Sequence, residues 1–381
     1  MPPDSVGLAC LVIQRSSRER PADRILREAL RGTPGLSRTQ GREISRRVFA
    51  FFRWRGLLDA ARPLARQTDE ALALAERFAR EPDSFSGADL RRAVPEWVAS
   101  QLEVTPAWLH ALQAEPALWL RARPGTGALL AAELREAAAP FPALPDTLRY
   151  AGPLDLFRTE PFQAGRFELQ DLASQLVGHL CAPQPGETWW DACAGEGGKM
   201  LHLSDLMQNR GLIWASDRSA RRLAALRLRA ARARCFNWRA APWDGGLRLP
   251  TRTRFDGVLL DAPCTGLGTW GRNPHARWTV TPADVAELHA VQLGLLRHAA
   301  PAVKPGGRLI YAVCTLTRAE TLGVADAFAP GGEWEPAPLP PEFPAPELLI
   351  PAGPGRWWAR PETAGANGMF IAAWRRVMPA P

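Results

Sequence analysis

The stretch Thr188-Trp189-Trp190-Asp191-Ala192-Cys193-Ala194-Gly195-Glu196-Gly197-Gly198-Lys199 decides the fold class. Its apolar start predicts a buried strand that stops at an acid, its small residues predict a tight turn, and Lys199 begins a predicted helix. Such a turn lets the backbone approach a ligand at the carboxyl end of a parallel strand. The glycines follow neither G-x-G-x-x-G nor G-x-x-x-x-G-K-[ST]. The turn therefore fits a dinucleotide or a nucleoside triphosphate poorly.

The alternation of strand and helix continues beyond this turn. We expect strands over 188–192, 212–216, 255–260 and 308–313, and helices over 199–208, 219–232 and 282–303. Strands that alternate with helices imply right-handed crossovers and a doubly wound, mostly parallel sheet. Residues 368–376 predict an additional strand, antiparallel and paired with 356–359.

The N-terminal part is predicted to be helical and is strongly basic. Residues 15–66 contain fourteen arginines and five carboxylates, and their apolar residues follow roughly helical spacing. This excess favours contact with RNA phosphates, with a solvated arginine-rich surface as the alternative. We expect a basic helical domain over 1–80, a small linking subdomain over 81–160 and the doubly wound domain over 161–381.

Composition narrows the class of protein. The 381 residues are 46% apolar and 23% charged, as in a soluble globular protein, and the net charge is +8. This balance favours a polyanionic partner, although a GC-rich genome that favours arginine codons explains the charge equally well. The six cysteines are widely spaced, without a C-x-x-C or H-E-x-x-H pattern, and no apolar run approaches a membrane span. We expect free thiols, no metal, no membrane, a cytoplasmic location and a monomer.

Two carboxylates beyond the turn extend a candidate cofactor site. Asp217 ends the second predicted strand, where a carboxylate accepts hydrogen bonds from a ribose diol; alternatively, it caps the following helix. Asp244 follows the third strand region and is a candidate for an adenine edge, with an ordinary turn before Gly245 as the alternative. A nucleoside site without a phosphate signature suggests S-adenosylmethionine.

Two cysteines follow the fourth and fifth predicted strands. Because these strands are neighbours in a doubly wound sheet, Cys264 and Cys314 should face one cleft, although a single buried thiol is usually structural. Such a pair suits methylation at C5 of a pyrimidine, since a thiolate added to C6 makes C5 nucleophilic. Asp261 is placed to act near N3; alternatively, it caps the loop that follows its strand.

These motifs resemble those of a known family. Residues 191–199 resemble D-x-C-A-A-P-G-G-K, residues 261–268 resemble D-x-P-C-S-G-x-G, and residues 311–315 resemble Y-S-T-C-S of the RNA 5-methylcytosine methyltransferases, the RsmB/Nop/NSUN family. The resemblance covers residue 162 to the end. More weakly, residues 42–49 resemble the NusB-like helical domain of the bacterial RsmB branch, whose members act on small-subunit ribosomal RNA.

The resemblance implies a fold and a role for each site residue. The fold is a Rossmann-like S-adenosylmethionine-dependent methyltransferase, in the α/β class, with an N-terminal all-α domain. Cys314 is then the nucleophile, and Cys264 assists release of the methylated base. The residues expected around S-adenosylmethionine are Cys193, Ala194, Gly195, Glu196, Gly197, Gly198, Lys199, Asp217, Asp244 and Asp261. The implied partner is RNA, with ribosomal RNA as the favoured class.

Several departures from the family pattern bear on activity. Gly195-Glu196 replaces Ala-Pro, so Glu196 either weakens cofactor binding or faces solvent, and Ala312-Val313 replaces Ser-Thr. The leading hypothesis is methylation of cytosine C5 in structured RNA. A non-catalytic RNA-binding or ribosome-assembly factor is the alternative, and DNA methylation is disfavoured. Candidate RNA contacts, with loop packing as the alternative, are Arg272, Arg277 and Trp278.

Overall fold

A computed structural model describes residues 4–135, 138–328 and 332–378 of the chain. It divides into two compact units. One unit comprises Met1–Pro116 with Thr265–Val285, and the other comprises Ala117–Cys264 with Ala286–Pro381. No helix in the described ranges is long and apolar enough to cross a membrane. The units do not follow the boundaries expected at 80 and 160, and the division into three named domains stays a prediction.

The first unit is helical. Its helices are α1 (Ser5–Arg15), α2 (Ala22–Gly32), α3 (Arg38–Trp54), α4 (Leu64–Arg80), α5 (Gly87–Arg91) and α6 (Pro106–Gln113). Helix α3 begins with a capping box, in which the Ser37 side chain and the Gln40 side chain each bond the other residue's backbone N–H. It ends on Trp54, which is fully buried and packs against Phe78 and Phe85.

The basic surface of this unit is partly neutralised by its own carboxylates. Among the described residues within 15–66, the arginines that form ion pairs include Arg18, Arg20, Arg24, Arg27, Arg46, Arg47 and Arg62. Several are adjacent helical pairs, such as Arg27 with Asp23 at 3.3 Å. The alternative of an arginine-rich solvated surface therefore describes part of this segment, and RNA contact by the rest stays a prediction.

The expected RNA contact by Arg277 is wrong, because this residue lies in the core of the helical unit. Its side chain is 0% exposed and donates to the carbonyl oxygen of Leu112 at 2.5 Å and to Oε1 of Gln113 at 2.8 Å. Trp278 beside it donates from Nε1 to the carbonyl oxygen of Phe52 at 2.6 Å. The packing alternative applies here: a guanidinium with several donors satisfies carbonyl groups at helix ends.

The second unit contains two sheets. The smaller sheet is antiparallel, in the order β2 (Ala138–Phe141), β3 (Leu144–Tyr150), β1 (Leu118–Ala122) and β4 (Phe167–Leu169). The larger sheet has the order β11 (Ile350–Gly353), β12 (Arg356–Ala359), β13 (Met369–Arg376), β9 (Val303–Val313), β8 (Phe255–Asp261), β5 (Thr188–Asp191), β6 (Leu212–Ala215) and β7 (Trp238–Ala240), while β10 (Trp334–Pro336) pairs with β13. Strands β5 to β9 are parallel, and β13 is antiparallel to β9 and β12. The predicted doubly wound sheet and its antiparallel last strand are confirmed.

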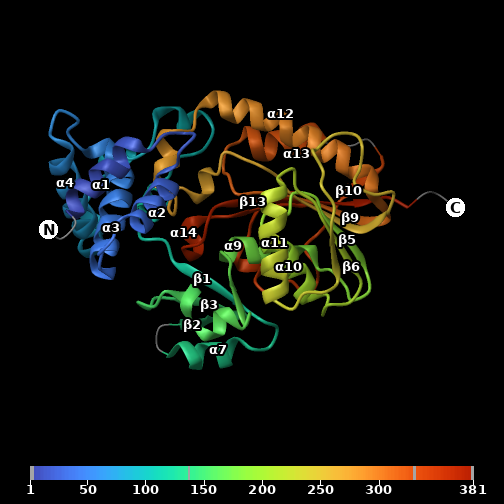
Figure 1. Cartoon of the computed structure of the whole chain (residues 1–381). Helices are drawn as coiled ribbons and strands as arrows, with labels where there is room; N and C mark the ends of the chain where they lie inside the picture. Colours follow the sequence, from blue (N-terminus) through green and yellow to red (C-terminus); the bar gives the residue numbers. More distant parts are fainter. Residues whose placement is uncertain (1–3, 136–137, 329–331, 379–381) are drawn as a thin grey trace. The chain divides into compact units, whose positions relative to one another are not determined.

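Helices cover both faces of the larger sheet (Figure 1), and the side chains of the parallel strands alternate between the two cores that these helices form. Trp189, Leu259 and Ile310 join the core beneath α9 (Leu172–Cys181), α10 (Gly198–Leu206) and α11 (Ala220–Arg232). Trp190 and Tyr311 point to the other core, beneath α12 (Pro282–Ala299) and α13 (Val324–Phe328). Because both faces are covered, these strands are continuous apolar runs.

The order of the strands locates the candidate site. Strand β5 lies in the middle, with β6 and β7 on one side and β8 and β9 on the other. The direction in which the chain fills the sheet therefore reverses between β5 and β8, where open α/β sheets bind ligands at the carboxyl ends of the strands.

Candidate active site

The two cysteines after β8 and β9 lie together. The Sγ atoms of Cys264 and Cys314 are 3.4 Å apart. A hydrogen bond from Cys264 is the main cause that lowers the pKa of Cys314, and the Lys199 ammonium lowers it further. Burial and the Asp261 carboxylate oppose this shift without cancelling it. The contact with Cys264 and the nearby ammonium thus favour the thiolate of Cys314, the form that a nucleophile requires.

Lys199 and Asp261 form an ion pair beside these thiols. The Nζ atom of Lys199, from the first turn of α10, is 2.6 Å from Oδ2 of Asp261 at the end of β8. Burial alone would lower the pKa of Lys199, but Asp261 outweighs it and raises the pKa. The lysine therefore carries its proton, and its charge also acts on Cys314. The predicted residues Lys199, Asp261 and Cys314 are thus brought together.

A buried hydrogen-bond network joins the segments that carry the cysteines. Gln292 on α12 donates from Nε2 to the carbonyl oxygen of Pro263 at 2.8 Å and to Oε1 of Glu320 at 3.0 Å. The other carboxylate oxygen of Glu320 accepts from Thr317 at 2.7 Å and from Thr315 at 3.3 Å. Pro263 precedes Cys264 and Thr315 follows Cys314, so one network fixes both segments. Gln292 and Glu320 are functional candidates that no local sequence pattern indicates, because each lies among other polar residues of its segment.

The turn after β5 has the conformation that its glycines allow. Gly195 has φ 56° and Gly197 has φ 88°, and a Cβ at Gly197 would lie 2.7 Å from Leu226. The backbone N–H of Gly195 donates to Asp217 at 3.1 Å. Glu196 is exposed, so it faces solvent, and its carbonyl oxygen accepts from Arg229 at 3.2 Å. Its carboxylate therefore does not fill the interior of the turn.

Asp217 and Asp244 differ in how closely they are tied to this turn. Asp217 is 6% exposed and accepts from the backbone N–H groups of Gly195 and Ser219, while Ser219 is the N-cap of α11. Asp217 thus connects the turn to the start of the helix. Asp244 accepts from the backbone N–H of Gly246 at 2.9 Å, as an ordinary turn aspartate does. It also lines a surface hollow of about 470 Å³ with Arg218 and Arg248.

Asp191, at the end of β5, is an additional candidate. It is fully buried, and within the described chain neither carboxylate oxygen has a hydrogen-bond partner of normal geometry. Burial and the neighbouring Asp261 carboxylate raise the pKa of Asp191 to about 8, although Lys199 opposes the shift. A buried carboxyl without a partner fits a cationic ligand group, such as the ammonium or sulfonium of S-adenosylmethionine. The sequence places an acid at this strand end but gives no indication of its role.

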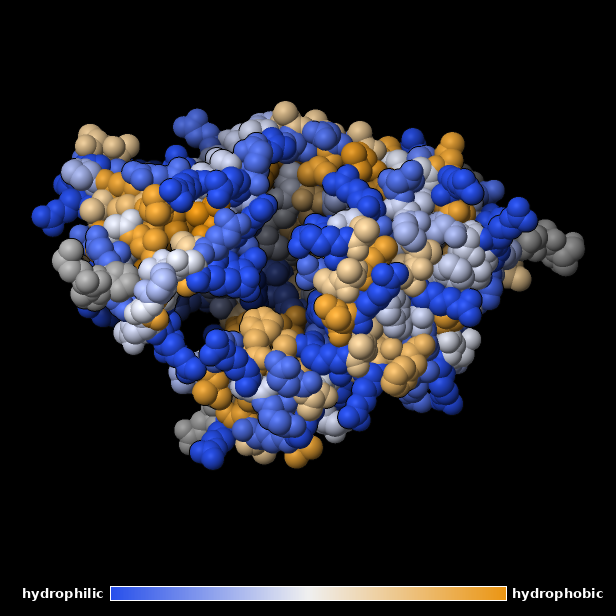
Figure 2. All heavy atoms as spheres, viewed as in Figure 1, coloured by the Kyte–Doolittle hydropathy of each residue, from blue (hydrophilic) through white to orange (hydrophobic). Residues whose placement is uncertain are grey.

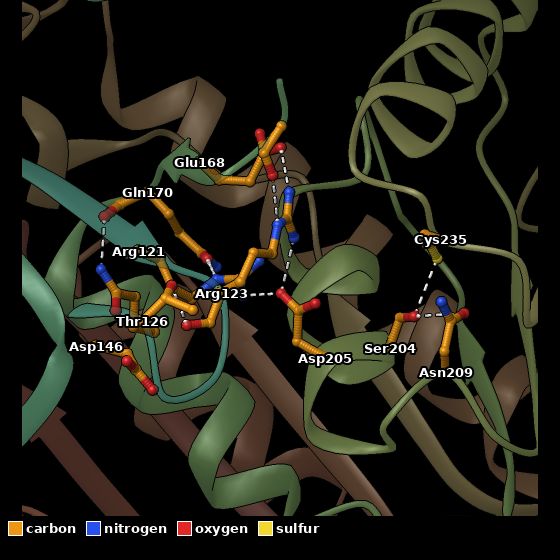
Figure 3. Close-up of polar contacts among 12 residues, drawn as sticks. Arg121, Arg123, Thr126, Asp146, Glu168, Gln170, Ser204, Asp205, Asn209 and Cys235 are labelled. Carbon is orange, nitrogen blue, oxygen red and sulfur yellow. Dashed lines mark hydrogen bonds and ion pairs between the residues drawn. The ribbon is translucent and has the colours of Figure 1, made fainter. Parts of the chain in front are cut away.

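An ion-pair network links the small sheet to α10 and α11, and Figure 3 shows its part around Arg123, Glu168 and Asp205. Glu168 on β4 is 1% exposed and is bound by Arg123 at 3.0 Å, Arg229 at 2.9 Å and Arg232 at 2.5 Å. Arg123 also pairs with Asp205 on α10 at 2.9 Å. Burial would raise the pKa of Glu168, but Arg229 and Arg232 outweigh it and lower the pKa. Through Arg229, this network reaches the carbonyl group of Glu196.

The sheet order and the residues at its carboxyl edge define a Rossmann-like methyltransferase fold. Residues 179–375 match the family described as 16S rRNA methyltransferase RsmB/F. The match covers just over half of the chain, and the protein belongs to this family.

Individual proteins agree with this assignment. The chain is 38% identical over 214 residues to the "Probable ribosomal RNA small subunit methyltransferase B" of Synechocystis sp., a match that covers 55% of this chain and 48% of the relative. It is 29% identical over 340 residues to the "Ribosomal RNA small subunit methyltransferase B" of Cronobacter sakazakii, which covers 85% and 72% respectively. The chain spans about half the length of the Synechocystis and Bacillus subtilis relatives that it matches.

Solved structures share the fold. The crystal structure of PH0851 superposes with a TM-score of 0.77 at 20% identity, over 99% of this chain and 100% of that one. The crystal structure of NSun6 from Pyrococcus horikoshii with SFG superposes with a TM-score of 0.62 at 19% identity, over 71% and 94%. At these identities, the likeness establishes the fold alone.

Proposed function

We propose that this protein transfers a methyl group from S-adenosylmethionine to C5 of cytosine in RNA, through a covalent adduct between Cys314 and C6. One observation carries the proposal: two thiols 3.4 Å apart lie beside a Lys199–Asp261 ion pair, at the carboxyl edge of a methyltransferase sheet. A single activated thiol would suit many reactions. A second thiol and a charged pair suit one that must both form and break a bond to carbon.

The turn after β5 and the acids around it would hold the cofactor. S-adenosylmethionine, when bound, supplies the methyl group as a sulfonium. Gly195 and Gly197 allow the backbone from Cys193 to Lys199 to approach a nucleoside closely, and Asp217 is placed for the ribose. Asp191 would meet a cationic group, and Asp244 would lie toward the adenine at the nearby hollow.

The proposed attack starts from the Cys314 thiolate. Its electron pair forms the bond to C6, and the electrons of the C5–C6 double bond shift toward C5 and N3. The Asp261 carboxylate can accept a hydrogen bond from the N4 amino group or from a protonated N3. Lys199, hydrogen-bonded to Asp261, carries the proton that balances the charge gained by the ring.

The Cys314–C6 bond must break again once C5 carries the methyl group. A base removes the proton from C5, its electrons restore the C5–C6 double bond, and the Cys314–C6 bond breaks to return the thiolate. Cys264 is placed to assist this step because its sulfur lies next to the departing sulfur. The Gln292–Glu320 network would keep both cysteines in position throughout.

Small-subunit ribosomal RNA is the proposed class of substrate. The family description and the names of the Synechocystis and Cronobacter relatives support it. A base in a folded RNA must leave its stack to reach the thiols, at a cost of a few kcal/mol. Phosphate contacts by arginines can offset that cost.

A non-catalytic RNA-binding factor is the second candidate, motivated by Gly195-Glu196 in the cofactor turn. A carboxylate inside the turn would favour this candidate, because it would hinder cofactor binding. Glu196 is exposed, so its carboxylate does not do so. DNA methylation remains disfavoured, because in that class the cysteine at the position of Cys264 is expected to be the nucleophile, whereas the RsmB/F family pattern places the nucleophile at Cys314.

The test uses wild type, Cys264→Ala and Cys314→Ala with S-adenosylmethionine and total RNA from a methylation-deficient host. We expect Cys264→Ala to trap an adduct that resists denaturation, and Cys314→Ala to form none. Sequencing the trapped RNA would locate the cytosine. Methylation of cytosine by Cys314→Ala would refute the assigned roles. If wild type neither reacts with RNA nor binds S-adenosylmethionine in calorimetry, the binding-factor function replaces this one.

A further inference from the structure

Helix α11 and the segment after it carry an unusual concentration of positive charge. From Arg218 to Arg239 there are eight arginines and no carboxylate. Those that are exposed are Arg218, Arg221, Arg222, Arg227, Arg234 and Arg239. The two others, Arg229 and Arg232, are engaged by Glu168. In this segment, two arginines are therefore ion-paired with a buried carboxylate, and the other six are exposed to solvent.

The exposed arginines are largely without counter-charges. Arg222 lies 3.7 Å from Asp217, and within the described ranges none of the other five exposed arginines forms an ion pair. The arginines of the helical unit differ, since many of them are paired with carboxylates on the same or an adjacent helix. Exposed like charges on one short segment repel one another, and a polyanion that binds there relieves the repulsion and releases counterions.

Apolar side chains stand among these charges. Leu228 is 76% exposed and Phe236 is 77% exposed. Leu228 lies seven residues after Arg221, so the two share one face of the helix, away from the buried Leu226. In Figure 2, hydrophilic and hydrophobic side chains are interspersed on the surface over this helix. An exposed ring next to guanidinium groups is the combination that binds single-stranded RNA, where phosphates meet arginine and bases stack on aromatic faces.

The surface continues toward the cofactor site. Arg218 directly follows Asp217 and lines the same hollow as Asp244 and Arg248. At the other end, Phe236 follows Arg234 and its backbone N–H is held by Asn209 at 2.8 Å. A strand of RNA along this face would therefore run from the segment after α11 to the rim of the proposed cofactor pocket.

We propose that the exposed face of α11, from Arg218 to Phe236, is an RNA-binding surface of the methyltransferase unit. It takes a single-stranded segment of the substrate that flanks the target cytosine. The arginines bind phosphates and Phe236 stacks on a base. The inference deepens the proposed function, on which its choice of RNA rests, and it assigns contacts beyond those expected of the basic N-terminal helices.

Binding of a fluorescein-labelled RNA hairpin with single-stranded flanks, measured by anisotropy across a salt series, tests the electrostatic part. The variant carries Arg221→Gln, Arg227→Gln and Arg234→Gln together. Loss of three phosphate contacts should make the slope of log K against log salt shallower by about 2, because each contact contributes about 0.7. That corresponds to roughly hundredfold weaker binding at about 0.1 M salt.

A matched variant separates a specific surface from overall charge. It carries Arg149→Gln, Arg158→Gln and Arg297→Gln, three exposed arginines on other elements of the same unit. It loses the same charge and should keep the wild-type slope. Equal losses in the two triple variants would mean that net charge alone matters and would overturn the proposal, as would a wild-type slope in the α11 variant. Thermal melts confirm that the exposed substitutions leave the fold intact.

The stacking part has its own test. Phe236→Ala should weaken binding roughly fivefold to a hundredfold and leave the salt slope unchanged. If Phe236→Ala binds as wild type and polyglutamate competes as well as RNA for the α11 face, the surface takes acidic chains in general and the RNA assignment fails. Because binding is measured without turnover, a wild type that binds RNA through α11 but never methylates it would refute the proposed function and leave this inference standing.

Discussion

The network around Gln292 allows a test of how the two cysteines are held. Gln292→Met keeps the length and approximate volume of a fully buried side chain and removes its amide. The carbonyl group of Pro263 and one oxygen of Glu320 then lose a donor, at 2.8 Å and 3.0 Å in the wild type. The buried carbonyl oxygen of Pro263 loses this donor, and a buried acceptor left unpaired costs about 1–3 kcal/mol, so we expect a loss of about 1–3 kcal/mol in the free energy of unfolding.

Gln292→Met should affect the attack step and the release step of the reaction to different extents. Pro263 directly precedes Cys264, whereas Cys314 keeps the contacts that Thr315 and Thr317 make with Glu320. Loosening Cys264 should slow release more than attack. A displacement of about 1 Å can cost a hundredfold in rate, so adducts should accumulate in Gln292→Met as a weaker form of the Cys264→Ala phenotype. Quenched-flow measurement of adduct formation and decay reads the two steps separately.

Gln175→Met is the matched control. Gln175 is also buried and donates to two carbonyl groups, those of Gln170 at 2.9 Å and Leu120 at 3.3 Å, away from the cysteines. Its Oε1 also accepts from Thr147 at 2.6 Å, so the variant should lose at least as much stability as Gln292→Met, without a change in adduct decay. If the two variants decay at the same rate when compared at equal folded fraction, the network stabilises the fold only, and its positioning role is refuted.

Three further predictions follow from the buried charges and the thiols. The pKa of Asp191 is raised to about 8, so the carboxyl group must lose its proton when a cationic ligand binds beside it. Affinity for S-adenosylmethionine should therefore rise with pH up to about 8, by up to tenfold per pH unit. Calorimetry of Asp191→Asn should show a flatter dependence of affinity on pH. Glu168→Gln leaves three arginines facing a neutral group and should cost about 3–5 kcal/mol in chemical denaturation, against less than about 1 kcal/mol for Asp155→Asn in an exposed pair. Because the pKa of Glu168 is lowered in the fold, its stabilising contribution is present above the unfolded pKa and is lost as pH falls through the folded value. Hydrogen peroxide should oxidise one active-site thiol to a sulfenic acid, which the other thiol attacks with loss of water to form a Cys264–Cys314 disulfide. The disulfide should abolish adduct formation until dithiothreitol reduces it. An intact protein mass that shows no loss of two hydrogens would contradict this prediction.

Periodic features of the sequence predicted the sheet and the meeting of the cysteines. Strands at the carboxyl edge of a parallel sheet must place Cys264 and Cys314 close together, and their sulfurs are in contact distance. The junction near Pro301 was less predictable. The expected helix over 282–303 ends at Ala299, because proline cannot continue the hydrogen-bonding pattern, and β9 already begins at Val303.

Residues whose function depends on distant partners were not predictable from local pattern. Arg277 looked like an RNA contact because it is an arginine in a loop, yet its partners lie about 165 positions earlier in the chain. Gln292 lies on a helix without any motif, and only the tertiary fold brings it to Pro263. Sequence pattern reports which side of an element is apolar, but it does not report which carbonyl groups need a donor.

The cofactor turn shows how a departure from the family pattern can be accommodated. Replacing Ala-Pro by Gly195-Glu196 gives up the fixed φ of proline and adds a glycine, and both changes raise the conformational freedom of the turn. The structure restrains the turn from both sides, because Asp217 accepts from the N–H of Gly195 and Arg229 donates to the carbonyl oxygen of Glu196. Arg229 is itself held by the buried Glu168. These restraints offset the conformational freedom that the departure adds and keep the turn in one conformation. The departure is therefore no argument for the binding factor, because the rest of the chain supplies the rigidity that proline would have given.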